Sequence, residues 1–270
     1  MRIDVNGIGL EVQDEGSGTP VLLLHGWPDS GRMWRHQVQA LTGAGFRCIV
    51  PDLRGFGESD KPDDVAAYAL PTLVGDVAGI LDQLGVARAH VVGHDWGAAV
   101  AWVTASLLPD RVDHLVAVSV GFPAAFASAG YAQREKSWYM LLFQFRDVAE
   151  QWLSMDNWKN FRQWSAHPEA DDVITILEKE GLTPGLNWYR ANLAPETLLT
   201  GPPPLPPVQA STMGVWSSGD MALTEAQMTG SQQFVSGDWR YERVEGAGHW
   251  VPLEEPETVN RLLVDFLPPM

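Results

Sequence analysis

The stretch VVGHDWGA at residues 91–98 decides the fold that this chain is expected to adopt. Its first residues are apolar, as in a buried strand, and an alanine-rich helical pattern begins at Gly97. A small-x-x-x-small pattern joins the two, with Asp95 at its centre. This pattern is typical of a nucleophile elbow, a sharp turn between a strand and a helix that presents one side chain. We therefore expect Asp95 to lie at the tip of a strand–turn–helix unit.

Nucleophile elbows usually carry serine. An aspartate in place of the serine changes the reaction that the elbow can perform. A carboxylate that attacks an acyl carbon forms an unstable anhydride, whereas one that attacks a saturated carbon forms an ester that water can cleave. The sequence therefore favours opening of a carbon–oxygen or carbon–halogen bond over esterase or peptidase chemistry. The alternative is that Asp95 only caps the helix that follows it, which is a common role of aspartate.

Strand and helix patterns alternate on both sides of the elbow. Strands are predicted at 20–25, 46–50, 89–92 and 112–118, and helices at about 33–41, 70–84 and 97–108. Continuous apolar strands that alternate with helices predict an α/β fold, with a parallel sheet covered on both faces. A hairpin is predicted at residues 3–13, with Gly7 and Gly9 in its turn region.

The alternation stops after the strand at 112–118. Residues 122–207 are rich in Trp, Tyr and Phe with helical patterns, and the run GPPPLPP closes this segment as a stiff connector. Strand patterns return at about 213–216 and 241–244, followed by a helix near 257–266. We therefore expect an α/β core made of residues 1–121 and 208–270, with residues 122–207 inserted as a helical cap.

A second motif, GAGHW, lies at residues 246–250. His249 follows the last predicted strand on a glycine-rich loop, which is where this architecture places its catalytic base. The alternative is an ordinary loop histidine, since the chain has seven histidines. Taken together with the aspartate elbow, the motif predicts a nucleophile–base pair.

The acid of a catalytic triad is expected at Asp220, in SSGD at residues 217–220. It follows the strand predicted at 213–216 and would orient the His249 ring and stabilise its imidazolium. The alternative is an aspartate that only shapes a turn. Some related enzymes place the acid after the preceding core strand. Here that region reads SVGF at 119–122 and has no carboxylate, which favours Asp220.

The motif HGWP at residues 25–28 follows the first apolar strand. A turn here can direct the backbone N–H of Trp27 into the site opposite that of Trp96, and the pair would form an oxyanion hole. A cis bond before Pro28 would suit such a sharp turn. The residues expected to shape the backbone near the site are His25, Gly26, Pro28, Gly93, His94 and Gly97.

With these motifs, the chain resembles the epoxide hydrolases of the α/β-hydrolase fold. The resemblance rests on HGWP at 25–28, DLRGFGESD at 52–60, the elbow at 93–98 and GHW at 248–250, and it covers nearly the whole chain. It implies a mostly parallel central sheet with helices on both faces and a helical cap. Haloalkane dehalogenases share most of these motifs, so the motifs define the superfamily better than the reaction.

Two tyrosines of the cap distinguish the epoxide hydrolases, in which they hydrogen-bond the epoxide oxygen. The segments around Tyr139 (SWYMLLFQ) and Tyr189 (LNWYR) are similar to the family segments that carry them. A phenol with a pKa of about 10 is neutral at pH 7, yet it is a much stronger acid than the alcohol formed by ring opening. The resemblance therefore implies that both residues activate the epoxide; the alternative is that they only pack their rings.

Two other functions stay open on the sequence alone. A haloalkane dehalogenase with the same triad would need N–H donors for the halide; Trp96 could supply one, but Trp27 stands where asparagine is frequent. Fluoroacetate-type dehalogenases usually carry arginine where this chain has Trp96. A non-catalytic receptor for small ligands is disfavoured by the intact set of Asp95, Asp220 and His249.

Composition limits the partners and the location. A net charge of −16 disfavours nucleic acid and anionic membranes as partners. No apolar run reaches the ~18 residues of a membrane helix, and the N-terminus lacks signal-peptide features, so we expect a cytoplasmic protein. The single cysteine, Cys48, is expected to be buried and inert. The expected partners are a small apolar epoxide and water, without a metal or organic cofactor; a homodimer is compatible with the sequence.

Overall fold

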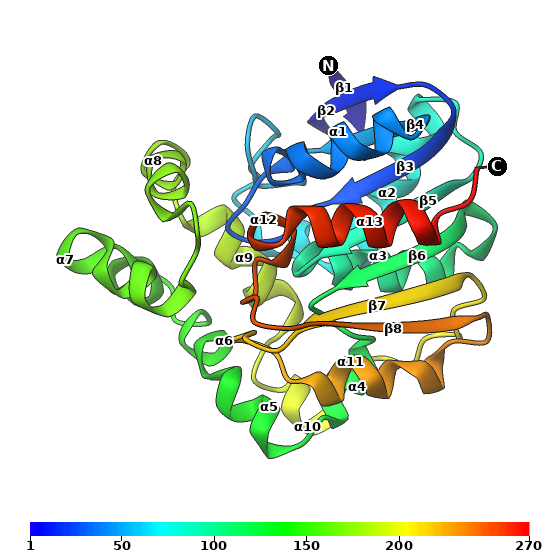
Figure 1. Cartoon of the computed structure of the whole chain (residues 1–270). Helices are drawn as coiled ribbons and strands as arrows, with labels where there is room; N and C mark the ends of the chain where they lie inside the picture. Colours follow the sequence, from blue (N-terminus) through cyan, green and yellow to red (C-terminus); the bar gives the residue numbers. More distant parts are fainter. Residues whose placement is uncertain (270) are drawn as a thin grey trace.

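The computed structural model describes residues 1–269, in which eight strands form one sheet in the order β1-β2-β4-β3-β5-β6-β7-β8 (Figure 1). The strands are β1 (Arg2–Val5), β2 (Ile8–Gly16), β3 (Thr19–Leu24), β4 (Phe46–Pro51), β5 (Ala89–His94), β6 (Val112–Val118), β7 (Ser211–Ser217) and β8 (Trp239–Val244). Strands β3 to β8 pair in parallel, while β1 and β2 pair antiparallel to their neighbours. The predicted mostly parallel sheet is confirmed.

Helices cover both faces of the sheet, which is why its central strands are apolar along their whole length. Helices α2 (Leu70–Gln83) and α3 (Trp96–Leu107) pack on one face, and α1 (Arg35–Gly43) and α13 (Pro256–Phe266) pack on the other (Figure 1). Successive strand residues point to opposite faces. Val91 accordingly belongs to the first core cluster and Val92 to the second, and both are fully buried.

The N-terminal hairpin is present, but its turn differs from the prediction. Asn6 and Gly7 have φ angles of 51° and 80° and connect the two strands. Gly9 lies inside β2, paired with Asp4, so its predicted place in the turn region is wrong. Asn-Gly is a favoured pair for a two-residue hairpin turn, because both positions need positive φ.

Helices fill the chain between β6 and β7, in a segment that we call the helical insertion (residues 122–207). Its helices are α4 (Pro123–Ser128), α5 (Tyr131–Lys136), α6 (Trp138–Leu142), α7 (Val148–Ser165), α8 (Ala170–Glu180), α9 (Thr183–Asn192) and α10 (Thr197–Thr200). In Figure 1, α7 and α8 extend away from the sheet, whereas α4 lies beside α11 (Glu225–Thr229) of the core.

The carboxyl ends of the parallel strands bring the predicted site residues to one edge of the sheet. Trp27 follows β3, Asp95 follows β5, Asp220 follows β7 and His249 follows β8. The strands are parallel, so these loops meet although they are far apart in the sequence.

Cys48 is a free, buried thiol, as predicted. None of the helices within residues 1–269 has the length and apolarity needed to cross a membrane.

Candidate active site

Asp95 occupies the turn between β5 and α3 with a φ of 52° and a ψ of −122°. A positive φ is costly for a residue other than glycine, and such strain concentrates at functional sites. Asp95 stands at the N-cap position of α3, but its side chain makes no capping hydrogen bond. Its Oδ1 instead accepts the backbone N–H of Trp27 at 3.0 Å. The Asp95 side chain therefore does not cap α3, which was the alternative role considered for it.

Three glycines allow the backbone to approach Asp95 closely. A Cβ atom on Gly93 would collide with the backbone of Gly97, and one on Gly97 would collide with the carbonyl of Leu24. A Cβ atom on Gly26 would collide with the Asp95 side chain itself. The small-x-x-x-small pattern of the elbow thus reflects the close packing of α3 against β5 and β3.

Asp95, His249 and Asp220 form a continuous chain of polar contacts. His249 Nε2 lies 3.6 Å from Asp95 Oδ2, and His249 Nδ1 lies 2.9 Å from Asp220 Oδ2. The other oxygen of Asp220 accepts the backbone N–H groups of Ala222 and Leu223 at 2.8 and 2.9 Å. All three triad side chains are buried. The structure therefore brings together the predicted nucleophile, base and acid.

The charges of this group are strongly coupled. Burial disfavours the imidazolium of His249, but the Asp220 and Asp95 carboxylates outweigh it and raise the pKa of His249 to about 10. Burial likewise opposes the charge of Asp220, yet the His249 ring and two backbone N–H groups keep the pKa of Asp220 below its usual value. While Asp95 is ionised, His249 is therefore protonated at neutral pH.

The loop after β3 supplies the backbone N–H that contacts Asp95. The Trp27–Pro28 bond is cis, in agreement with the prediction. His25 Nε2 accepts the N–H of Leu53 at 2.9 Å, and its Nδ1 lies 2.9 Å from the carbonyl oxygen of Gly26. His25 thus joins this loop to the loop after β4, as expected of a structural residue.

The sequence predicts the backbone N–H of Trp96 as the second donor of the oxyanion hole. No hydrogen bond from the Trp96 N–H to Asp95 is seen within residues 1–269, so Trp27 is the donor that contacts the carboxylate in this structure.

His94 Nε2 lies 2.9 Å from the carbonyl oxygen of His249. Burial lowers the pKa of His94 to about 4, so this ring is neutral and holds the His249 loop in place.

Tyr139 in α6 and Tyr189 in α9 reach this site from the helical insertion. Their side chains are buried, and their ring centroids are 6.1 Å apart. The Tyr189 ring meets the rings of Trp96 and Trp27, with centroids 5.1 and 6.0 Å apart. Burial, followed by the Asp95 charge, raises the pKa of both phenols well above the usual value. Both hydroxyls therefore stay protonated, and both experience the charge of the Asp95 carboxylate.

Aromatic rings enclose the two tyrosines. The ring centroid of Trp164 lies 4.7 Å from that of Tyr139 and 5.8 Å from that of Trp27. Phe143 packs against the rings of Tyr139 and Trp164. Among the described residues, the buried indole N–H groups of Trp27 and Trp164 have no hydrogen-bond partner. The walls that these rings form are therefore apolar, apart from the two indole N–H groups and the phenol hydroxyls.

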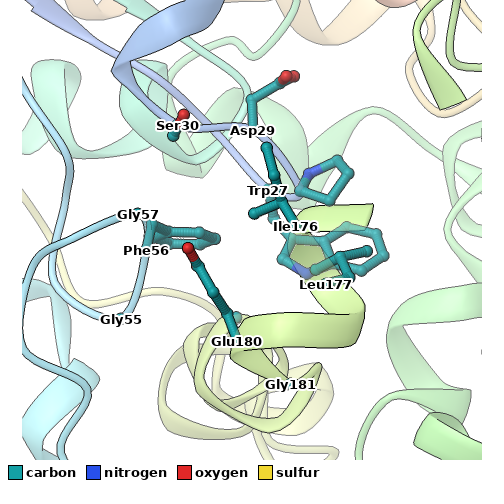
Figure 2. A pocket seen from close by; sticks show the side chains of 12 residues that line it. Trp27, Asp29, Ser30, Gly55, Phe56, Gly57, Ile176, Leu177, Glu180 and Gly181 are labelled. Atoms are coloured by element: carbon teal, nitrogen blue, oxygen red, sulfur yellow. The ribbon is translucent and has the colours of Figure 1, made fainter. Parts of the chain in front are cut away.

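A small cavity lies beside this aromatic cluster (Figure 2). It is lined by the core loops at 27–30 and 55–57 and by the end of α8, including Glu180. Burial raises the pKa of Glu180, which belongs to this partly enclosed wall. Trp27 and Pro28 of the site also line the cavity, and the backbone N–H of Trp27 donates to Asp95.

The structure also reveals residues that hold the Asp220 loop and that sequence reasoning missed. Gln133 in α5 donates to the carbonyl of Ala222 at 2.9 Å and accepts the backbone N–H of Thr224 at 2.8 Å. Lys136 on the same helix donates to the backbone carbonyl of Asp220. No sequence signal distinguishes these two residues from ordinary polar residues of a surface helix.

Comparison with known proteins identifies the family of this chain. Residues 19–256 match the family model described as alpha/beta hydrolase fold. The chain is 32% identical to epoxide hydrolase A of Mycobacterium tuberculosis and 33% identical to epoxide hydrolase 2 of Siraitia grosvenorii. In both cases 98% of this chain and 96% of the relative are covered.

Solved structures give the same result. A Bacillus megaterium epoxide hydrolase in complex with an inhibitor matches with a TM-score of 0.90 at 26% identity, covering 98% of this chain and 99% of that one. Epoxide hydrolase A of Mycobacterium thermoresistibile matches with a TM-score of 0.84 at 30% identity, covering 99% and 97%. Fold and site define a hydrolase enzyme of the α/β-hydrolase fold. Within it, the chain belongs to the epoxide hydrolase family.

Proposed function

We propose that this protein hydrolyses a small epoxide to a vicinal diol through a covalent ester on Asp95. The observation that carries the proposal is that four side chains interact at one site: Asp95, His249, Tyr139 and Tyr189. The Asp95 carboxylate contacts the Trp27 N–H and lies near His249, and its charge acts on both buried phenols. Such a site can attack a saturated carbon while it donates protons to the departing oxygen.

In the first step, an Asp95 oxygen attacks one ring carbon of the epoxide. The bond between that carbon and the ring oxygen breaks, and its electron pair goes to the oxygen. Tyr139 and Tyr189 bind this oxygen, and one of them donates its proton. Burial keeps both phenols protonated, so they are available as donors at neutral pH.

In the second step, His249 deprotonates a water molecule that attacks the ester carbonyl. Esterification removes the Asp95 charge, one of the two charges that raise the pKa of His249. The base is therefore released only after the ester has formed. The imidazolium gives up its proton, and this proton restores the phenol that protonated the ring oxygen. The backbone N–H groups of Trp27 and Trp96 hold the oxyanion, and Asp220 stabilises the imidazolium. The bond between the carbonyl carbon and the alkoxy oxygen then breaks. That oxygen takes up the proton of the new carboxylic acid, so the diol leaves and Asp95 is again a carboxylate.

We also propose that residues 122–207 act as a cap domain over a core of residues 1–121 and 208–270. Support comes from the ring contacts of Tyr189 with Trp27 and Trp96 of the core, and from the contact of Trp164 with Trp27. This aromatic enclosure favours a small apolar substrate. A cytoplasmic location and a homodimer stay predictions from the sequence.

A single-turnover reaction in ¹⁸O-labelled water tests the ester route. Water attacks the carbonyl carbon of the ester, so the label enters the Asp95 carboxylate in the first turnover and the diol in later ones. Peptide mass spectrometry locates the label. Label in the diol, but not in the Asp95 peptide, after one turnover would refute the covalent route.

Haloalkane dehalogenation is the second candidate, because the unpartnered indole N–H groups of Trp27 and Trp164 are the type of donor that can hold a halide. Diol formation from a styrene-type epoxide and bromide release from bromoalkanes are to be measured side by side. We expect the diol reaction to dominate. Faster bromide release would transfer the assignment to the dehalogenase.

A further inference from the structure

A second group of chemically active side chains lies at the opposite edge of the sheet from Asp95. His90 is the second residue of β5, and Asp113 and His114 are the second and third residues of β6. Each offers one ligand atom, and these atoms lie within 4.8 Å of one another. The proposed reaction does not use these residues.

An irregularity in strand pairing brings the three side chains together. Ala89 pairs with Val112 and Val91 pairs with Leu115, so two residues of β6 stand opposite His90. Consecutive strand residues normally point to opposite faces, and a bulge redirects a side chain locally. Both Asp113 and His114 therefore contact the same histidine; the His90 and His114 rings are 5.0 Å apart.

His90 is in the tautomer that a metal ligand requires. Its Nε2 lies 2.8 Å from the carbonyl oxygen of Pro268, which can only accept, so Nε2 carries the proton. Nδ1 is then an unprotonated lone pair; it is buried and has no hydrogen-bond partner among residues 1–269. Metal-binding histidines commonly donate their second ring N–H to a backbone carbonyl.

One of the two ligand–ligand distances agrees with tetrahedral coordination, and the other is a hydrogen bond that an ion would replace. Zinc bonds to nitrogen and oxygen are about 2.0–2.2 Å, so ligand atoms lie roughly 3.3–3.5 Å apart. His90 Nδ1 lies 3.4 Å from Asp113 Oδ2, which fits this spacing. His114 Nδ1 lies 2.8 Å from the same oxygen, which is a hydrogen-bond distance. A bound ion would replace this hydrogen bond and move the two atoms apart. The Asp113 and His114 side chains are 18% and 20% exposed, so an ion and a water ligand can enter from solvent.

We propose that His90, Asp113 and His114 form a zinc site at the amino-terminal edge of β5 and β6. Two imidazoles and a carboxylate are ligands that suit Zn²⁺, and water would complete the coordination. Arg88 Nη1 lies 3.3 Å from Asp113 Oδ1 and is half exposed, so it competes with the ion for this carboxylate. The site would fasten the chain end to the sheet, through Pro268 and through Phe266, whose ring lies 5.4 Å from His114.

The test titrates the full chain, freed of metal with a chelator, with zinc chloride, using calorimetry and thermal unfolding. We expect one ion per chain and a rise in melting temperature. His114→Gln and Asp113→Asn should each weaken binding by about tenfold or more, since each removes a ligand. These residues are partly exposed, so the test does not depend on replacing the fully buried His90. Circular dichroism checks that the variants are folded.

Two further variants make the test specific. Arg88→Gln removes the competing cation and should tighten zinc binding, an effect that a merely structural cluster would not produce. His36→Gln alters a partly exposed histidine outside the cluster and should leave binding unchanged. Zinc affinity that is equal in the wild type, His114→Gln and Asp113→Asn would overturn the proposal. So would the absence of any zinc-dependent rise in melting temperature.

Discussion

His249 Nε2 lies 3.6 Å from Asp95 Oδ2, so the proposed base and the proposed nucleophile form an ion pair. This pairing, together with Asp220, raises the pKa of His249 to about 10 against the opposing effect of burial. A histidine in this state cannot accept a proton from water at neutral pH. In the proposed mechanism, the formation of the ester itself makes the base available.

The Asp95→Asn variant mimics the neutral ester and should lower the pKa of His249. The sign follows from charge: without the Asp95 carboxylate, the imidazolium loses one stabilising partner while burial still disfavours it. NMR titration of the His249 ring measures the shift. His94, whose ring adjoins His249, serves as an internal reference for a neutral imidazole. An unchanged His249 pKa in Asp95→Asn would contradict the proposed release of the base.

The His249→Gln variant should accumulate the ester. Glutamine removes the base that activates water but leaves the Asp95 carboxylate as a nucleophile, so the first step continues and the second stops. Intact-protein mass spectrometry should find one added epoxide mass per chain. The matched control is the double variant Asp95→Asn/His249→Gln, which should stay unmodified. A comparable adduct on the double variant would place the reaction elsewhere.

Replacement of the two buried phenols should slow ring opening. Tyr139→Phe and Tyr189→Phe each leave one donor for the ring oxygen, whereas the double variant leaves neither. A loss of about 10²–10⁴-fold in kcat/KM is expected for the double variant, with smaller losses for the single ones. Tyr131→Phe is the control, because Tyr131 lies on the same helical insertion but is 74% exposed. Equal rates in the double variant and the wild type would leave the phenols with a packing role.

The buried ion pair of Arg54 and Asp76 should matter more for stability than any exposed pair. Both side chains are 4% exposed, and the guanidinium makes two hydrogen bonds of 2.8 Å to the carboxylate. Arg54→Met leaves Asp76 buried and uncompensated, which costs about 3–5 kcal/mol of the free energy of unfolding. Urea denaturation measures the loss. Lys179→Met, which breaks an exposed pair with Glu58, should change stability far less.

Gly26→Ala should reduce activity more than stability. The new methyl group would collide with the Cβ and Oδ1 atoms of Asp95 and displace the nucleophile from the Trp27 N–H. We expect a loss of kcat with the fold retained, as measured by a steady-state assay and a melting curve. Gly43→Ala, where a methyl group meets open space, is the control and should leave both quantities nearly unchanged.

Local patterns were sufficient to predict the core, since its strands are buried on both faces and therefore continuously apolar. The elbow around Asp95 could be predicted because its glycines are required by close backbone contacts that leave a mark in the sequence. The turn at Asn6 and Gly7 likewise has a recognisable sequence, because Asn-Gly suits two residues with positive φ. The prediction for Gly9 is wrong because a single glycine does not show whether it lies in a turn or pairs with a neighbouring strand.

Features that depend on long-range register left no such mark. The approach of Asp113 and His114 to His90 requires both the neighbouring positions of β5 and β6 and an irregular pairing between them. The support of the Asp220 loop by Gln133 and Lys136 requires knowledge of where α5 lies. Neither arrangement follows from hydrophobic periodicity.

The two phenols and the triad belong to different parts of the chain: Tyr139 and Tyr189 lie between β6 and β7, while Asp95, Asp220 and His249 follow strands of the sheet. In the proposed mechanism, the residues that follow the strands form and cleave the ester, and the tyrosines of the inserted helices bind the epoxide oxygen. Evolution could therefore exchange the inserted helices and alter the range of electrophiles accepted without redesigning the hydrolytic machinery. A chimera that retains the sheet and carries a foreign insertion would be a natural starting point for new catalysts.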